Sequence, residues 1–366
     1  MGVFAPQANK SILETPLYQA GKPIEEVERE FGLTSIIKLA SNENAIGASP
    51  KALKAAQDAL LEMQMYPDAS YARLRTAIAE YNDVETHNVT VGNGSENCID
   101  FLIKAFLNEK SNAIVDQYCF STIQILVKAE NAKLIKIPSI NYRQDIDATI
   151  KAVDENTKII FVVNPNNPTG TYATHDELVR LLKNIPSHIL VISDEAYFEY
   201  VDKIDYPKTL QLVKQYPNLI VSRTFSKVFG LAGLRLGYLI SSREVSDILN
   251  RSRLPFNVNS CAVAAGIAAL ADKDFLAKTK KINTDGLQQL REGLDKLGLE
   301  YIPSVTNFIT INLKKSGLEI FNQLLAKGMI VRPLVPYGLL NHIRVTVGTK
   351  EQNEMFLSAL KELIDV

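Results

Sequence analysis

The sequence has 366 residues, of which 46% are hydrophobic and 22% charged, as in an ordinary soluble globular protein large enough for two domains. Its 40 basic and 41 acidic residues leave a net charge of -1, and no long basic run marks it as a nucleic-acid-binding protein. The three cysteines, Cys98, Cys119 and Cys261, lie far apart, so we expect neither a disulfide framework nor a metal site.

Residues 1–6 lack the apolar core of a secretory signal peptide, and Pro6 stands where a myristoylation signal has Ser or Thr. No apolar run approaches the roughly 20 residues that are needed to cross a bilayer. We therefore expect a soluble, cytoplasmic protein that binds neither membranes nor nucleic acid.

The first part of the chain is predicted to be mainly helical, with helices over residues 25–31, 50–63 and 71–81. Ser41-Asn42-Glu43-Asn44 is polar turn sequence ahead of the second helix. Tyr66-Pro67-Asp68 separates the second helix from the third.

From residue 88 onwards, short apolar strands alternate with amphipathic helices. Strands are predicted at residues 88–92, 113–116, 133–137, 158–163, 189–193, 218–221 and 236–241, and helices at residues 95–107, 121–129, 146–152 and 176–183. This alternation predicts an α/β fold with a mostly parallel central sheet that helices cover on both faces.

After about residue 259 the pattern changes to that of a smaller α+β unit. Helices are predicted at residues 260–271, 276–297, 318–327 and 350–364, and strands at residues 307–313, 329–332 and 343–347. We expect a large domain over residues 41–275. Residues 276–366 would form a small domain together with an N-terminal arm, residues 1–40.

The first candidate for chemistry is Lys227, which ends the segment Ser222-Arg223-Thr224-Phe225-Ser226-Lys227. This segment follows a predicted strand, and the ends of strands are where α/β proteins place their sites. Arg235 stands eight residues later, next to glycines. A buried lysine can act as an amine nucleophile toward carbonyl groups. A solvated surface lysine is the ordinary alternative, so the assignment needs support from other motifs.

Three further motifs follow predicted strands. Gly92-Asn93-Gly94-Ser95-Glu96 opens a helix whose backbone N–H groups can bind an anion, although it matches neither a dinucleotide fingerprint nor a P-loop. Residues 164–170, Asn-Pro-Asn-Asn-Pro-Thr-Gly, offer amide donors and acceptors. Asp194, with Tyr197 nearby, ends a buried strand, where a carboxylate needs a cation or a metal. Each motif alone could also be a simple turn or helix cap.

Together these residues match one cofactor, pyridoxal 5′-phosphate. Its aldehyde requires a lysine, its ring nitrogen an aspartate, its phosphate an arginine with a glycine-rich turn, and its ring oxygen an asparagine with a tyrosine. The aspartate keeps the ring nitrogen protonated, so the ring can accept the electron pair of a carbanion.

The sequence resembles the fold-type I aminotransferases over essentially its whole length, and most closely their histidinol-phosphate branch. The residues that carry the resemblance are Ser41-Asn42-Glu43-Asn44, Tyr66-Pro67-Asp68, Gly92-Asn93-Gly94-Ser95-Glu96, residues 164–170, Asp194-Glu195-Ala196-Tyr197, residues 222–227, residues 232–237 and residues 343–349.

The resemblance implies roles for the residues around the cofactor. Lys227 would hold it covalently and then move a proton between the substrate and the cofactor, while Asp194 would pair with the ring nitrogen. Asn167 and Tyr197 would bond the ring oxygen, and Tyr118 matches the aromatic residue that stacks on the ring. The residues that would hold the phosphate are Gly94, Ser95, Glu96, Ser226 and Arg235.

It also implies roles in assembly and substrate binding. Tyr66 matches the tyrosine that reaches the phosphate of the neighbouring subunit, which implies a homodimer with shared active sites. Arg344 would bind the anionic end of the substrate, with Arg332, Tyr18 and Asn167 as further candidates.

The implied reaction moves an amino group from glutamate to imidazole-acetol phosphate, which is the biosynthetic direction for histidine. The sequence has Ala45-Ile46 where the family usually has Pro and then an aromatic residue or leucine, and Leu340 where proline is common. Both segments border the substrate pocket in the family, so an aromatic or broad-specificity aminotransferase remains an alternative. A phosphothreonine-type decarboxylase and an aminotransferase-like ligand sensor are weaker alternatives, and the sensor would come with a DNA-binding module.

Overall fold

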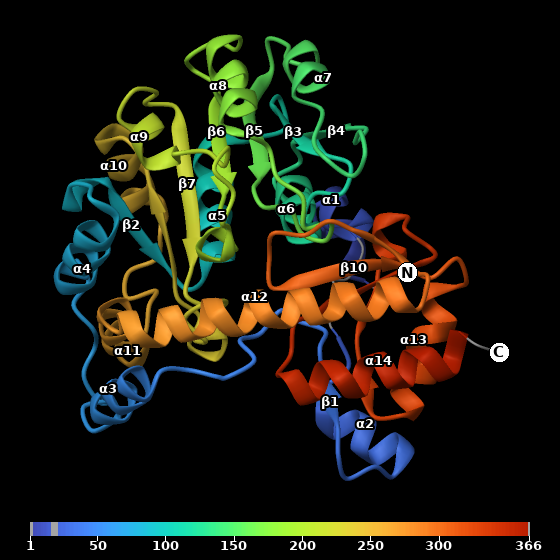
Figure 1. Ribbon diagram of the computed structural model, residues 1–366. Coiled ribbons are helices and arrows are strands. Elements are labelled where there is room, and N and C mark those ends of the chain that lie inside the picture. Colours follow the sequence, from blue (N-terminus) through green and yellow to red (C-terminus); the bar gives the residue numbers. More distant parts are fainter. Residues whose placement is uncertain (1–2, 16–20, 365–366) are drawn as a thin grey trace.

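The computed structural model describes residues 3–15 and 21–364, which form a large and a small lobe (Figure 1). A seven-stranded sheet organises the large lobe, and a four-stranded and a two-stranded sheet organise the small one. The long helix α12 (Lys273–Lys296) runs past both lobes and contacts β9 and β10 of the small lobe.

The seven-stranded sheet confirms the predicted fold class. In spatial order its strands are β2 (Val89–Gly92), β8 (Gly237–Ile240), β7 (Leu219–Thr224), β6 (Leu190–Asp194), β5 (Thr157–Val163), β3 (Asn112–Asp116) and β4 (Lys133–Ile137). Only β8 runs antiparallel to its two neighbours, β2 and β7, among the strands of this sheet.

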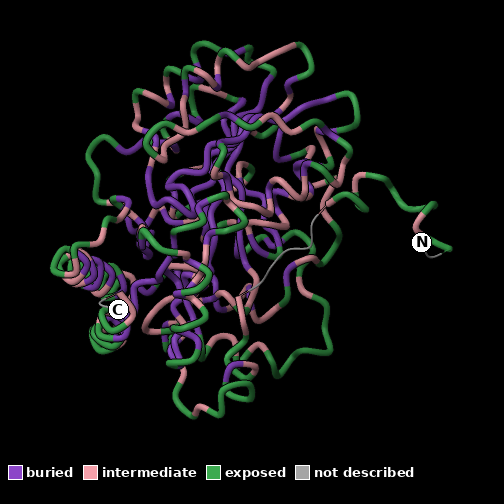
Figure 2. Tube along the Cα trace, turned by 90° about the vertical axis from the view of Figure 1, so that its right-hand side faces the viewer, coloured by how far each residue is buried: buried purple, intermediate pink, exposed green. Residues whose placement is uncertain are grey.

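Apolar side chains fill both faces of this sheet, because successive residues of a strand point to opposite sides. In β5, Ile160 and Val162 join one hydrophobic cluster, whereas Phe161 joins the other. The first face is covered by α3 (Pro50–Leu60), α4 (Ala72–Asn82), α7 (Ile146–Lys151), α8 (His175–Lys183), α9 (Thr209–Val213) and α11 (Ser260–Ala271). The second is covered by α5 (Ser95–Phe106), α6 (Ser121–Ala129) and α10 (Arg243–Ser252). Figure 2 shows the buried residues concentrated in the interior of the molecule, with most exposed residues at its periphery.

The small lobe contains an antiparallel sheet in the order β12 (Arg332–Pro333), β13 (His342–Thr346), β10 (Phe308–Asn312) and β9 (Glu300–Ile302). Its other helices are α2 (Ile24–Phe31), α13 (Gly317–Ala326) and α14 (Lys350–Ile364), and α1 (Lys10–Glu14) lies near α6. β1 (Ile37–Lys38) pairs with β11 (Met329–Ile330), so the end of the N-terminal segment joins the C-terminal unit. The predicted domain boundaries stay a prediction.

The differences from the prediction lie mostly in short elements. The strand predicted at residues 329–332 is divided into β11 and β12, which pair with different neighbours, and the helix predicted to end at residue 63 ends at Leu60. Helices α1, α9 and α10 and strands β1 and β9 were not predicted. Five 3₁₀ turns were not predicted either: Ala5–Gln7, Thr86–Asn88, Phe198–Tyr200, Ala232–Leu234 and Val335–Tyr337.

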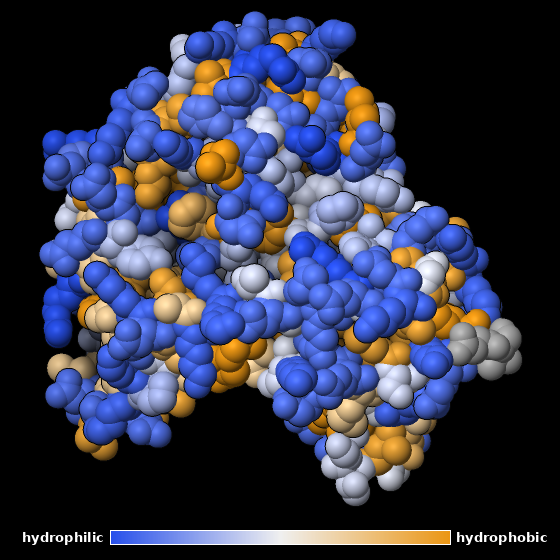
Figure 3. Space-filling model, in the orientation of Figure 1, coloured by the Kyte–Doolittle hydropathy of each residue, from blue (hydrophilic) through white to orange (hydrophobic). Residues whose placement is uncertain are grey.

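The ends of the central strands set the place of the site. β5, β6 and β7 are parallel neighbours, and the last residue of β6, Asp194, lies in register with Val163 and Ser222. On the face seen in Figure 3, hydrophilic residues predominate and hydrophobic ones form small groups. Within the described part of the chain, no helix combines the length and the apolar character that a membrane span requires.

Candidate active site

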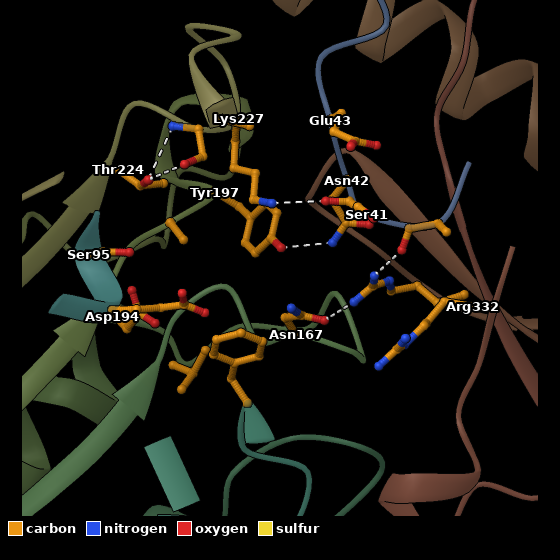
Figure 4. A pocket seen from close by; sticks show the side chains of 18 of the residues that line it. Ser41, Asn42, Glu43, Ser95, Asn167, Asp194, Tyr197, Thr224, Lys227 and Arg332 are labelled. Atoms are coloured by element: carbon orange, nitrogen blue, oxygen red, sulfur yellow. Dashed lines mark hydrogen bonds between the residues drawn. The ribbon is translucent and has the colours of Figure 1, made fainter. Parts of the chain in front are cut away.

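A cavity of about 270 Å³ lies at this edge of the large sheet, and residues of the small lobe, Arg332, Tyr337 and Arg344, form part of its lining. It brings together many of the predicted site residues (Figure 4). Those that line it are Ser95, Glu96, Asn167, Asp194, Tyr197, Ser226, Lys227, Arg235, Arg332 and Arg344.

Lys227 follows β7 in a turn that is anchored by the buried side chains of Phe225 and Val228. Its Nζ donates a hydrogen bond of 3.0 Å to the backbone oxygen of Ser41. Burial, and secondarily the positive charge of Arg344, lowers the pKa of the Lys227 ammonium to about 8. A substantial fraction of the amine is therefore neutral near pH 8 and able to react with a carbonyl group.

Asp194 is the last residue of β6, and only 5% of its surface is exposed. Its Oδ1 has no hydrogen-bond partner among the described residues. Burial raises the pKa of this carboxyl group to about 7. A buried carboxyl oxygen without a donor calls for one from a ligand, and a cationic N–H would stabilise the charged form best.

An anion cradle lies where α5 begins. Gly94 has a φ of 93°, and a Cβ on it would come within 2.8 Å of Nη2 of Arg235. A Cβ on Gly237 would lie 2.2 Å from the backbone nitrogen of Ser95, so only glycine allows β8 to approach so closely. The helix N-terminus and the Arg235 guanidinium together favour a phosphate. Arg235 contacts Glu96 at 3.3 Å.

Tyr197 and Asn167 lie on opposite sides of the cavity (Figure 4). The Tyr197 hydroxyl accepts a 2.8 Å hydrogen bond from Nδ2 of Asn42, and burial raises the pKa of Tyr197 to about 12, so it stays protonated. Oδ1 of Asn167 accepts a hydrogen bond from Nη1 of Arg344.

These features fit pyridoxal phosphate. The unpartnered Asp194 oxygen suits its ring nitrogen, the glycine-lined cradle its phosphate, and the reactive amine of Lys227 its aldehyde. Asn167 and Tyr197 line the same cavity and carry polar groups that can hydrogen-bond to an oxygen of a ligand.

The remaining predicted site residues lie elsewhere. Gly94 is not part of the lining, although it lies against the Arg235 side chain, which is. Tyr118 contacts the ring of Tyr142, with centroids 6.0 Å apart, and is not part of the lining. Tyr66 is 82% exposed and packs on Phe256, with ring centroids 4.8 Å apart. Tyr18 falls outside the described residues.

Asn42 and Tyr337 are among the lining residues to which the sequence assigned no role. Asn42 belongs to a motif that was interpreted as a turn and as part of the family resemblance, with no role given to Asn42 itself, and its contact with Tyr197 joins positions 155 residues apart. Tyr337 lines the cavity, and burial raises the pKa of its phenol. The only sequence signal for Tyr337 was that its loop departs from the family pattern.

Comparisons with known proteins agree with this geometry. The family model described as aminotransferase class I and II matches residues 34–360. The chain is 44% identical to histidinol-phosphate aminotransferase 1 of Nitrosococcus oceani over 348 residues, covering 95% of this chain and 94% of that protein. It is 44% identical to histidinol-phosphate aminotransferase 2 of Pseudomonas fluorescens strain Pf-5 over 365 residues, covering 99% of each.

Among solved structures, histidinol-phosphate aminotransferase from Sinorhizobium meliloti in complex with pyridoxal-5′-phosphate is similar to this chain, with a TM-score of 0.89 and 25% identity. The match covers 98% of this chain and 97% of that one.

The raised pKa of Asp194 predicts a pH-dependent stability of the protein without cofactor. In the folded state this carboxyl keeps its proton up to about pH 7, whereas in the unfolded chain it loses the proton near its ordinary pKa of 3.8. The carboxyl group of Asp194 therefore favours the folded state at low pH, and the free energy of unfolding falls as the pH rises from about 3.8 to about 7. The variant Asp194→Asn lacks the titration, so its stability advantage over the wild type should grow by about 2 kcal/mol between pH 5.5 and pH 8.

Urea unfolding of both proteins at the two pH values measures this difference. Saturating pyridoxal phosphate at pH 8 should favour the wild type instead, because only a carboxylate can pair with the ring N–H. An advantage of equal size at both pH values would show that Asp194 is not buried as a high-pKa acid.

Proposed function

The chain belongs to the class I and II aminotransferase family, and on this premise we propose that it is a pyridoxal-phosphate-dependent transaminase that acts on histidinol phosphate. The reaction converts histidinol phosphate and 2-oxoglutarate to imidazole-acetol phosphate and glutamate, and histidine biosynthesis uses it in reverse. The names of relatives that are 44% identical over nearly the whole chain support this substrate. A cytoplasmic location stays a prediction.

The observation that carries the proposal is the shared cavity of Lys227 and Asp194, two ionisable groups whose pKa values burial shifts toward neutrality. When bound, pyridoxal phosphate supplies an electron sink for the electron pair left at the substrate α-carbon. Asp194 would hold a positive charge at the ring nitrogen. Lys227 would bind the cofactor and, once released by the substrate, take the α-proton with its neutral amine.

Two arginines from the small lobe would read the substrate. Arg332 of β12 and Arg344 of β13 lie directly opposite each other in the antiparallel register, and both line the cavity. Side by side, two guanidinium groups suit a phosphate dianion, whose oxygens can accept from both. Arg344 is held in place by its hydrogen bonds to Asn167 and to the backbone oxygen of Ala40.

The alternative of an aromatic or broad-specificity aminotransferase rested on two departures from the family pattern. Ala45, Ile46 and Leu340 are not among the residues that line the cavity, and Leu340 is largely exposed. Their identities therefore do not shape the described cavity, and no observation favours the alternative substrate.

If Arg332 reads the phosphate, the variant Arg332→Leu should lose activity selectively. A hydrogen bond between charged groups contributes about 1.5–3 kcal/mol, so kcat/KM for histidinol phosphate should fall about tenfold to a hundredfold. With phenylalanine, which has no phosphate, the change should stay within about threefold. Steady-state assays with both amino donors measure this.

Arg332→Lys is the matched control, because it keeps the charge without the planar fork of donors. Its kcat/KM for histidinol phosphate should lie between those of the wild type and Arg332→Leu. Equal losses with both donors for Arg332→Leu would contradict the role in phosphate binding.

We further propose a homodimer with shared active sites. Around Tyr66 the surface exposes several large apolar side chains, which are Leu60, Leu61, Met63, Met65, Leu254 and Phe256. An apolar surface of this kind is typical of a protein–protein contact. In a twofold dimer, the same surface of each subunit would face the other subunit, and Tyr66 would contact the partner's phosphate cradle.

Mixing two impaired variants tests the sharing. If Tyr66 serves the partner subunit, a Tyr66→Ala chain paired with a Lys227→Ala chain forms one site that is wild-type in both residues. Refolding an equal mixture should then give about a quarter of the wild-type activity per site, well above the average of the two variants refolded separately. Activity equal to that average would show that the two residues act within one chain.

A further inference from the structure

The Tyr197 hydroxyl group is tied to Asn42, a residue from the segment that crosses between the two lobes. Asn42 is 1% exposed and has a φ of 56°, a backbone conformation that asparagine tolerates better than most residues. Its side-chain Nδ2 donates to the Tyr197 hydroxyl at 2.8 Å (Figure 4). Among the described residues, no group accepts a hydrogen bond from this hydroxyl.

Thr346 determines which way the Asn42 amide faces. Its Oγ1 accepts a 2.9 Å hydrogen bond from the backbone N–H of Asn42. The one proton of the threonine hydroxyl is then available to Oδ1 of Asn42, at 3.2 Å. With Oδ1 directed to Thr346, the NH₂ group of the same amide must face Tyr197.

This arrangement fixes the polarity of Tyr197. A phenol has one proton, and because its oxygen already accepts from Asn42, that proton points away from Asn42. Asn167 is polarised in the same way, since its Oδ1 accepts from Arg344 and its NH₂ group is left to donate. Both residues therefore offer a donor to the cavity.

We infer that Asn42 is a positioning residue, held by Thr346, that keeps Tyr197 a hydrogen-bond donor toward the cavity. The inference rests on the proposed function, because the acceptor would be the ring oxygen of pyridoxal phosphate between Tyr197 and Asn167. Asn42 itself does not contact the reacting atoms in this assignment.

The variant Asn42→Asp tests the polarity, since it keeps the shape but replaces the donor by an acceptor. The Tyr197 proton is then drawn to the carboxylate, and the ring oxygen loses a donor. Without that donor, the ring oxygen of the cofactor keeps more negative charge. The proton on the neighbouring Lys227 nitrogen is then held more strongly. The pH midpoint of the visible absorption of the bound cofactor should therefore rise, by about one pH unit for one charge-assisted hydrogen bond.

The introduced charge alone could also raise this midpoint, so the same change is made in a Tyr197→Phe background. We expect a rise that is about one pH unit larger with Tyr197 present than with phenylalanine. Thr346→Val, which leaves the Asn42 amide free to turn, should raise the midpoint by less than Asn42→Asp does. Thr346→Ser keeps the hydroxyl group and should have the wild-type midpoint. The Thr346 variants also keep the test valid if Asn42→Asp does not fold.

Asn307→Ala is the matched structural control. The Nδ2 of Asn307 donates to the backbone oxygen of Asn42 at 3.0 Å, so this change loosens the same segment without altering the polarity of Tyr197. Its midpoint should stay within about 0.2 pH units of the wild type.

Equal rises for Asn42→Asp in both backgrounds, or a rise in Asn307→Ala as large as in Asn42→Asp, would overturn the inference and leave the proposed function intact. A wild-type protein that takes up no pyridoxal phosphate would instead overturn the proposed function.

Discussion

The carboxyl group of Asp194 is removed from water at the end of a buried strand, and the rest of the site is arranged around it. Burial raises its pKa from the ordinary value of 3.8 to about 7, which makes ionisation less favourable by about 4 kcal/mol. No described residue donates to its Oδ1. Such an arrangement lowers the stability of the empty protein at neutral pH, and binding a protonated ring nitrogen would recover part of that cost. The burial of the Asp194 carboxyl group would thus favour binding of the cofactor.

The segment of residues 40–44 connects this carboxyl site to the small lobe. Its backbone oxygens accept hydrogen bonds from Arg344 at Ala40 and from Lys227 at Ser41, and its Asn42 side chain donates to Tyr197. One short stretch therefore positions the amine and the phenol from the large lobe together with the arginine from the small lobe. The site is complete only where both lobes meet, so a change in this segment affects several functional groups at once.

The sequence predicted the elements whose pattern is local. Helices α6, α11 and α14 have the predicted bounds, and Asp194 ends a buried strand as expected, because apolar periodicity and chain turns determine such features. The division of one predicted strand into β11 and β12 depends on which strands lie beside it, and the contact of Asn42 with Tyr197 joins distant positions, so neither has a local signal. The cofactor match came from the motifs around Lys227, Asp194 and Arg235, whereas the roles of Tyr66 and Tyr118 came from the family resemblance, and all of these roles stay predictions. For Tyr66 the described chain shows an exposed ring that packs on Phe256.

We propose that Lys227 forms the covalent bond to pyridoxal phosphate in the cavity that it shares with Asp194. Reduction of the cofactor-loaded protein with borohydride fixes that bond, and peptide mapping by mass spectrometry then locates the attached group. We expect a single modified peptide that carries the label on Lys227, and no label when Lys227 is replaced by alanine. A label on another lysine, or none in the loaded wild-type protein, would contradict it.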